Sequence, residues 1–170
     1  MKIVLDSSSL ILLAKTGMLG IVTGHFECEI TEDVKRESTH KKDCMGAKAI
    51  IKLIEDKKIE IRRINPKRDV EIEFRLGKGE ATSIALALEE NKILATDDKA
   101  AINACKILGV EFITAIDFVL KAYKKGEISH EEAKNKIMNL DKYGRYSTEI
   151  INRALEKIGD KNEQSNKSKT

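Results

Sequence analysis

Short apolar runs alternate with amphipathic stretches along most of the chain. Residues 3–5 and 93–95 are apolar runs typical of buried parallel strands, and residues 28–30 predict a further brief strand. Residues 59–64 alternate isoleucine with charged side chains, which predicts a strand near the edge of a sheet. Residues 110–113 predict a fifth strand before the next helical pattern.

Helical patterns separate these strands, because apolar side chains recur at a spacing that places them on one helix face. Residues 67–75 are charged and predict no regular element. Since strands and helices alternate, we expect an α/β fold, a three-layer α/β/α sandwich around a central, mostly parallel sheet. The predicted helices cover residues 10–14, 31–38, 43–57, 81–90, 99–108 and 115–125.

The pattern changes after Gly126, where strands no longer follow helices. Two further helices are expected over residues 129–140 and 147–158, the first with a Ser-x-x-Glu capping-box pattern at its start. The last stretch contains no apolar side chain, which is typical of disorder. We therefore expect a domain over residues 1–125, C-terminal helices over 126–159 and a disordered tail over 160–170.

Composition narrows the classes of partner. The net charge of +3 permits binding to nucleic acid without requiring it, and an aromatic share of 4% with no tryptophan argues against a base-stacking surface. Three cysteines without a C-x-x-C pair and three scattered histidines give no support to a zinc site. Asp6 interrupts the apolar start, and no apolar run approaches the ~20 residues of a membrane span. We therefore expect a cytoplasmic protein with no membrane partner.

Acidic residues stand where predicted strands give way to helices. Asp6 follows the first strand directly, and Asp97 and Asp98 follow the strand at 93–95. Glu80 opens a helix behind a Gly-Lys-Gly lead, and Glu37 lies on the helix after the second strand. Because the carboxyl ends of parallel strands meet at one edge of a sheet, we expect a pocket of three to five carboxylates there.

Carboxylates packed this closely repel one another and raise one another's pKa unless a cation neutralises them. Hard oxygen ligands suit Mg²⁺ or Mn²⁺, and such a site favours hydrolysis of a phosphodiester. The alternative is that Asp6, Glu80 and Asp97 only cap helices and that Glu37 is an ordinary solvated helix residue. Residue spacing alone leaves both interpretations open.

Four segments, in this order and spacing, resemble the PIN-domain ribonucleases, and most closely the prokaryotic branch with the VapC-type toxins. The resemblance extends over about residues 1–125 and implies an α/β/α sandwich with an acidic pocket that cleaves RNA with Mg²⁺ or Mn²⁺. The opening Asp-Ser-Ser after a strand and the Thr-x-Asp after a buried strand are its most specific parts. The segments are VLDSSSLILLAK, TEDVKRES, LGKGEATSIALALE and ILATDDKAAINACKILGV.

The resemblance also assigns roles by motif. It implies that Asp6, Glu37, Glu80 and Asp98 are the catalytic acids. It implies that Asp6, Glu80 and Asp98 hold the metal ion, with Asp97 as a neighbour that ligates in addition or instead. Glutamate at position 80 replaces the aspartate that is commoner in VapC-type members, and we expect the flexible glycine lead to absorb the extra methylene.

Substrate contacts follow from the same resemblance. Ser8 is similar to the small polar residue two places after the first acid, and Lys78 and Lys99 are basic side chains expected at the rim, where they would meet RNA phosphates. We expect an endoribonuclease, the toxin of a toxin–antitoxin pair, with RNA, a protein antitoxin and a second copy of the chain as partners. The alternative is a non-catalytic PIN-like module that binds RNA or protein.

Overall fold

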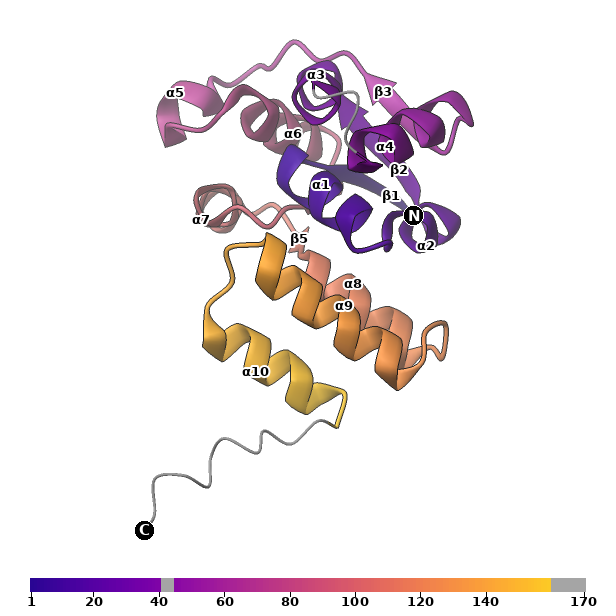
Figure 1. The fold of residues 1–170 in the computed structure, drawn as a ribbon. Coiled ribbons are helices and arrows are strands. Elements are labelled where there is room, and N and C mark those ends of the chain that lie inside the picture. Colours follow the sequence, from indigo (N-terminus) through magenta and orange to yellow (C-terminus); the bar gives the residue numbers. More distant parts are fainter. Residues whose placement is uncertain (41–44, 160–170) are drawn as a thin grey trace. The chain divides into compact units, whose positions relative to one another are not determined.

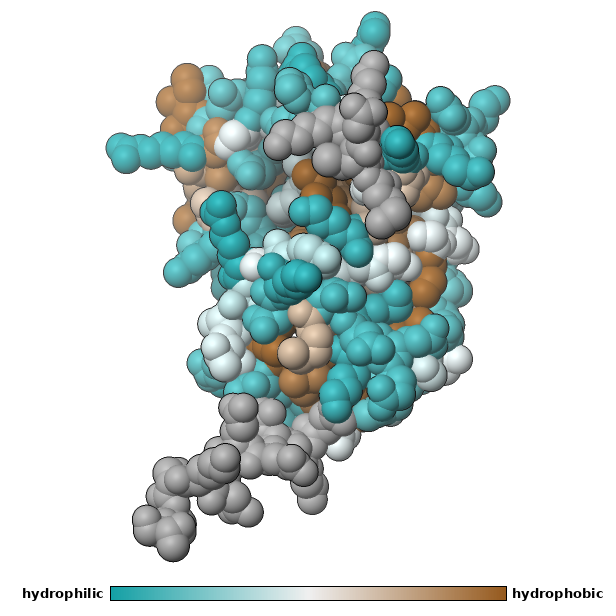
Figure 2. All heavy atoms as spheres, in the orientation of Figure 1, coloured by the Kyte–Doolittle hydropathy of each residue, from teal (hydrophilic) through white to brown (hydrophobic). Residues whose placement is uncertain are grey.

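The computed structural model describes residues 1–40 and 45–159, whose elements are drawn in Figure 1. The chain divides into two compact units, Met1–Ala115 and Ile116–Thr170. The tail predicted to be disordered, residues 160–170, lies outside the described residues. Hydrophilic side chains cover most of the face drawn in Figure 2.

The predicted α/β fold is confirmed: a five-stranded sheet forms the centre of the first unit, and it is entirely parallel where a mostly parallel sheet was expected. The strands are β1 (Lys2–Leu5), β2 (Glu27–Thr31), β3 (Ile59–Arg62), β4 (Ile93–Ala95) and β5 (Phe112–Ile113). Their order is β3-β2-β1-β4-β5. The chain places β2 and β3 on one side of β1, and then β4 and β5 on the other side. In such sheets ligands bind outside the carboxyl ends of the strands at the point of reversal, which here lies between β1 and β4.

In the described part of the first unit, seven helices follow or precede these strands, and they cover both faces of the sheet. Val4 and Leu94 are register partners in β1 and β4, and both pack into an apolar cluster with α6 and α7. Ile3 and Leu5 point to the opposite face, where α1 and α4 lie (Figure 1). The helices are α1 (Ser7–Lys15), α2 (Leu19–His25), α3 (Glu32–Thr39), α4 (Met45–Glu55), α5 (Val70–Phe74), α6 (Lys78–Glu89) and α7 (Lys99–Leu108).

Helix α5 corrects one prediction, because it lies in the charged stretch that was expected to be irregular. The Asp69 carboxylate caps it by accepting the backbone N–H of Ile72 at 3.2 Å, and Val70 is its one buried residue. Five residues are too few to show a helical period, so the capping aspartate was the only local signal of this helix.

The second unit contains α8 (Ala115–Lys124), α9 (His130–Tyr143) and α10 (Thr148–Lys157), as the apolar spacing predicts. The capping box at the start of α9 is confirmed, since Ser129 and Glu132 each accept the other's backbone N–H. In the described part of the chain no single helix is long and apolar enough to cross a membrane. Helices α1 and α2 reach that length only together, and they bend by 115° at the break between them.

Candidate active site

Asp6 lies at the carboxyl end of β1, fully buried, and caps helix α1. Its backbone N–H donates to the carbonyl of Ala95 in β4 at 3.0 Å, so the sheet itself fixes its place at the point of reversal. Its carboxylate accepts the Ser9 backbone N–H at 2.8 Å, the Ser8 hydroxyl at 2.8 and 3.0 Å, and the Thr96 hydroxyl at 2.5 Å. Three different donors therefore hold this carboxylate in one orientation.

Asp6 is buried without a basic partner among the residues that the structure describes. Burial raises the pKa of its carboxyl to about 7, although the hydrogen bonds from Thr96, Ser9 and Ser8 act in the opposite direction. The nearby Asp97 carboxylate raises it further. Among residues 1–40 and 45–159 no lysine, arginine or histidine forms an ion pair with Asp6. The charged form of this carboxyl is therefore poorly stabilised by the protein alone.

The two aspartates after β4, Asp97 and Asp98, differ in their hydrogen-bond partners. The Asp97 carboxylate accepts the Ser9 hydroxyl at 2.6 Å and the backbone N–H of Ala115 at 3.0 and 3.2 Å. Asp98 caps α7, and its Oδ1 accepts the backbone N–H groups of Ala100 and Ala101 at 2.8 and 2.9 Å. Both oxygens of Asp97 thus hold the framework together, whereas Asp98 Oδ2 accepts no hydrogen bond from the described residues.

Glu80 corrects the predicted start of its helix. Helix α6 begins at Lys78, with Gly77 as its N-cap, so the Gly-Lys-Gly segment is the first helical turn and not a flexible lead. The Glu80 carboxylate accepts the Gly77 backbone N–H at 2.7 Å. Burial raises the pKa of the Glu80 carboxyl, and the carboxylates of Asp98 and Glu37 raise it further. Glu80 is therefore within electrostatic reach of acids from two other helices.

Glu37 reaches the same place from α3. Its Oε1 accepts the backbone N–H of Gly79 at 2.9 Å, and its Oε2 accepts the Ser7 hydroxyl at 2.5 Å. A Cβ at position 79 would collide with Glu37 Oε2 and lie 2.8 Å from Ser7 Oγ. The absence of a side chain at Gly79 therefore lets the Glu37 carboxylate lie directly over the backbone of α6, and a Cβ there would displace it.

The three consecutive serines at the start of α1 distribute their hydroxyls among three acids. Ser7 donates to Glu37, Ser8 to Asp6 and Ser9 to Asp97. The first turn of α1 thus connects acids from three elements. Ser8, predicted to contact substrate, donates to Asp6 and accepts the backbone N–H of Asp97 at 3.0 Å; its contact with substrate stays a prediction.

Four residues that hold the acids were not predicted as part of the site. Each is adjacent, in the chain or in space, to an acid that was predicted. The run of serines after Asp6 and the threonine before Asp97 could have indicated three of them from the sequence. Gly79 gave no such signal, since its contact with Glu37 joins positions 42 residues apart. The four residues are Ser7, Ser9, Gly79 and Thr96.

The two predicted lysines lie at helix starts. Lys78 is the first residue of α6 and Lys99 the first of α7, and both side chains are exposed. Neither forms an ion pair with an acid in the described part of the chain. Their ammonium groups are therefore available to a solvent-borne anion.

Within residues 1–40 and 45–159, no three histidine, cysteine, aspartate or glutamate side chains already form a group that could hold a metal ion. The chemistry of the donors nevertheless fits Mg²⁺ or Mn²⁺, because the candidate ligands offer only carboxylate and hydroxyl oxygens. Burial first, and neighbouring acids after it, raise the pKa of the Asp6 and Glu80 carboxyls, so a divalent cation would stabilise their charged forms. Asp98 Oδ2 and Glu80 Oε1 are oxygens that accept no hydrogen bond from the described chain.

Comparison with known proteins identifies the family to which the chain is similar. A family model described as a PIN domain matches residues 2–160. Among solved structures, a PilT N-terminus domain protein from the hyperthermophilic archaeon Sulfolobus solfataricus P2 is similar in fold. It has a TM-score of 0.50 and 22% identity over 72% of this chain and 93% of its own. A domain of a functionally unknown protein from Methanocaldococcus jannaschii DSM 2661 has a TM-score of 0.44 and 24% identity over 66% and 89%. The comparison with curated proteins finds no match.

Proposed function

The chain belongs to the PIN-domain family, and from this premise we propose that it is an endoribonuclease that depends on Mg²⁺ or Mn²⁺. PIN domains are typically metal-dependent nucleases. The observation that carries the proposal is that Asp6, Glu80 and Asp98 lie at the carboxyl edge of the sheet and that none of them forms an ion pair with a lysine, arginine or histidine of the described residues. Acids that only cap helices would not need to approach one another there.

The proposal gives each acid a separate role. Asp6, Glu80 and Asp98 would hold the metal ion, which when bound lowers the pKa of water and stabilises charge on a phosphoryl oxygen. Asp97 keeps the end of β4 attached to α1 and to Ala115, and so acts as a positioning residue. Glu37 is held within reach of the same edge, where it would orient the attacking water and accept its proton.

Hydroxyl groups and lysines complete the proposed site. Ser8 and Thr96 hold the Asp6 carboxylate in a single orientation, which prepares it to bind a cation without rearrangement of the sheet. Lys78 and Lys99 would contact phosphates on either side of the cleaved bond. These contacts favour a polyanionic substrate but do not select a sequence.

Cleavage of RNA by the purified protein tests the proposal. With Mn²⁺, the wild-type protein should cut a fluorescently labelled single-stranded RNA, and EDTA should stop the reaction. Asp6→Asn should abolish cleavage, while Asp56→Asn, a change of an exposed acid after α4, should not. Cleavage by Asp6→Asn at the wild-type rate would remove the proposal.

We further propose that the protein is the toxin of a toxin–antitoxin pair and acts in the cytoplasm, with a protein antitoxin or a second copy as partner. The resemblance to the VapC-type toxins supports this role. Helices α9 and α10 also expose three large apolar side chains, Met138, Tyr143 and Ile150, that a partner could cover. Induced expression should arrest growth, whereas expression of Asp6→Asn should not, and light scattering on the purified protein would reveal a dimer.

A non-catalytic RNA-binding module is the second candidate. The observation in its favour is that no three metal-binding side chains of the described residues are already grouped. A Mn²⁺ titration separates the two functions. RNA binding that is insensitive to metal, without cleavage, would favour the module, whereas Mn²⁺ binding that starts cleavage favours the nuclease.

A further inference from the structure

Ser83 of α6 is fully buried, and within residues 1–40 and 45–159 its hydroxyl is the one buried side-chain polar group without a hydrogen-bond partner. We propose that this hydroxyl belongs to the acid site and donates to an oxygen ligand of the divalent cation when the cation is bound. The inference rests on the cation binding in the proposed function and adds a positioning residue to it. Buried polar groups without a partner are rare in folded proteins and lower their stability, so each calls for a physical reason.

The position of Ser83 on α6 places it beside the acids. It follows Gly79 by four residues and Glu80 by three, so the three residues lie along one side of the helix. Side chains on a helix lean toward its N-terminus, and the Ser83 side chain therefore lies over the turn that contains Gly79. That turn borders the acid site, because the Gly79 backbone N–H donates to Glu37 Oε1 at 2.9 Å.

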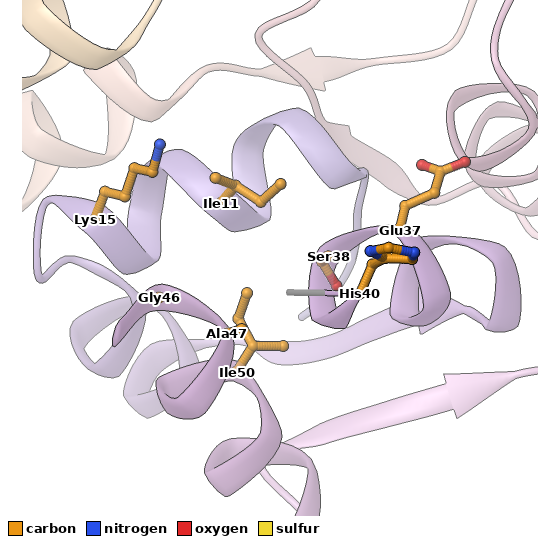
Figure 3. A pocket seen from close by; sticks show the side chains of 8 residues that line it. All are labelled: Ile11, Lys15, Glu37, Ser38, His40, Gly46, Ala47 and Ile50. Carbon is orange, nitrogen blue, oxygen red and sulfur yellow. The ribbon is translucent and has the colours of Figure 1, made fainter. Parts of the chain in front are cut away.

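Glu37 and Ser7 occupy the space over the same turn. A Cβ at Gly79 would lie 2.8 Å from Ser7 Oγ and would collide with Glu37 Oε2. Figure 3 shows that the Glu37 carboxylate points away from Ile50 of α4, and its bond to Gly79 fixes it against α6. Ser83 bonds to neither group. Its hydroxyl therefore faces the acid site with its hydrogen-bonding capacity unused.

The sheet supports the same placement. The register of β1 with β2, continued to the ends of the two strands, brings Thr31 beside Asp6. Thr31 Oγ1 lies 2.8 Å from Thr82 Oγ1, and Ser83 is the next residue of α6. This part of α6 thus lies over the strand ends where Asp6 is buried.

Other helical hydroxyls of the protein donate to the carbonyl four residues earlier, which is the ordinary role of serine and threonine inside a helix. Those of Ser38, Thr39 and Thr82 do so at 2.7, 2.7 and 2.9 Å. Ser83 does not, and the carbonyl of Gly79, its acceptor by that rule, accepts the Thr82 hydroxyl at 3.3 Å. Alanines occupy neighbouring buried positions of α6, Ala81 and Ala85, so packing alone gives no reason for a hydroxyl at position 83.

A hydrogen-bond donor fits the surroundings of a cation site. Carboxylates that hold a metal ion are themselves held by donors around them, and removal of one such donor typically lowers metal affinity by about 10- to 100-fold. The oxygen ligands of Mg²⁺ and Mn²⁺, carboxylate or water, accept a hydrogen bond from a hydroxyl. Without metal the same hydroxyl only lowers stability, because it has no partner. Ser83 therefore has opposite effects on the metal-free and the metal-bound protein.

Ser83→Ala tests the inference through two measurements that should move in opposite directions. In EDTA its melting temperature should rise by about 2 °C, because the unpartnered hydroxyl is gone. Its dissociation constant for Mn²⁺, measured by isothermal titration calorimetry at pH 8, should increase by about 10-fold. A serine with only a structural role would give a lower melting temperature and the affinity of the wild type.

Thr23→Val in α2 is the matched control. It removes a buried hydroxyl that has a partner, since Thr23 donates to the carbonyl of Gly20 at 3.2 Å, and α2 contains no acid. Its melting temperature should not rise, and its affinity for Mn²⁺ should equal that of the wild type. Asp6→Asn, which removes a proposed ligand, should lose Mn²⁺ binding in the same titration.

Two results with Ser83→Ala would overturn the inference. If the variant binds Mn²⁺ as tightly as the wild type, the hydroxyl takes no part in the surroundings of the cation. If the variant melts at a lower temperature in EDTA, the hydroxyl has a partner within the fold. RNA cleavage tests the nuclease function separately, because a wild type that binds Mn²⁺ without cutting RNA ends that proposal and leaves Ser83 to be judged by the affinities. A wild type that binds no Mn²⁺ would overturn both.

Discussion

Glu29 in β2 and Asp6, directly after the neighbouring strand β1, are both buried carboxylates, 1% and 0% exposed, but only Glu29 is paired with basic side chains of the described residues. Glu29 in β2 pairs with Lys92, with Arg62 at 3.0 Å and with Lys2 at 3.3 Å. Burial raises the pKa of the Glu29 carboxyl, but its partners, Lys92 first, outweigh burial and hold the pKa below its usual value. Charge on Glu29 is therefore fully balanced inside the fold.

Among the described residues Asp6 receives only hydroxyl and N–H donors, and the charged group that shifts its pKa is another acid, Asp97. Its pKa is raised to about 7 for that reason and because it is buried. Since the same fold brings three cations to Glu29, the lack of a cation at Asp6 among the described residues is a property of the site and not a limit of the fold. A cation from solution would do at Asp6 what Lys92 does at Glu29.

The largest expected effect is on stability at Glu29. Glu29→Gln leaves Lys2, Arg62 and Lys92 without their buried partner, so the free energy of unfolding should fall by about 3 kcal/mol. Glu60→Gln is the matched control, because Glu60 is the exposed register partner of Glu29 in β3 and should change stability by less than ~0.5 kcal/mol. Urea unfolding at pH 7 measures both. Equal losses would mean that the cations do not stabilise Glu29.

At Asp6 we expect the free energy of unfolding to depend on pH. Because its folded pKa is about 7 and its ordinary value 3.8, the folded protein binds the extra proton between these pH values. Stability should therefore decrease as pH rises from about 4 to 7, by up to about 1.4 kcal/mol per pH unit, and then level off. Chemical unfolding of the wild type and Asp6→Asn across this range, in EDTA, isolates the effect.

Metal ions extend the same test. At pH 8, Mn²⁺ should raise the unfolding free energy of the wild type and have less effect on Asp6→Asn, since binding to the folded state alone is stabilising. If the wild type and Asp6→Asn differ in stability by the same amount from pH 4 to 8, with and without Mn²⁺, then Asp6 is not an unbalanced buried carboxyl that a cation stabilises.

Gly79→Ala should lower RNA cleavage without lowering the stability of the folded protein. Alanine is the better helix former by about 1 kcal/mol, so the melting temperature should not fall. The new methyl group would push the Glu37 carboxylate from its place, and cleavage should drop by about 10²-fold. Gly20→Ala, in open space on α2, should leave cleavage unchanged. Loss of activity in both variants, or in neither, would show that Glu37 is not positioned by this contact.

The comparison also shows what local sequence can reveal. The acids after β1 and β4 and the all-parallel sheet were predictable, because a strand that ends in an acid before a helix is a pattern of a few neighbouring residues. The start of α6 was not, since Gly77 and Gly79 suggest flexibility unless one knows that Glu37 lies above Gly79. A close approach between distant segments leaves no local periodicity.

The cluster around Glu29 was hidden for the same reason. A glutamate inside a short strand gives no sign of whether it faces solvent, and its cations come from three other parts of the chain, at positions 2, 62 and 92. Neither the balance at Glu29 nor the imbalance at Asp6 can be obtained from residue spacing. Both depend on which side chains the sheet brings together.

The smallest expected effects concern exposed cations that, unlike those around Glu29, form no ion pair with another of the described residues. Lys78→Ala and Lys99→Ala, at the starts of α6 and α7, should each weaken RNA binding by a few-fold and reduce its salt dependence by about one phosphate contact. Lys106→Ala at the other end of α7 is the matched control and should change neither. Fluorescence anisotropy of Asp6→Asn, which should bind but not cut, allows the titrations at several salt concentrations. If Lys106→Ala weakens binding as much as Lys99→Ala, RNA does not approach the protein along the acidic edge of the sheet.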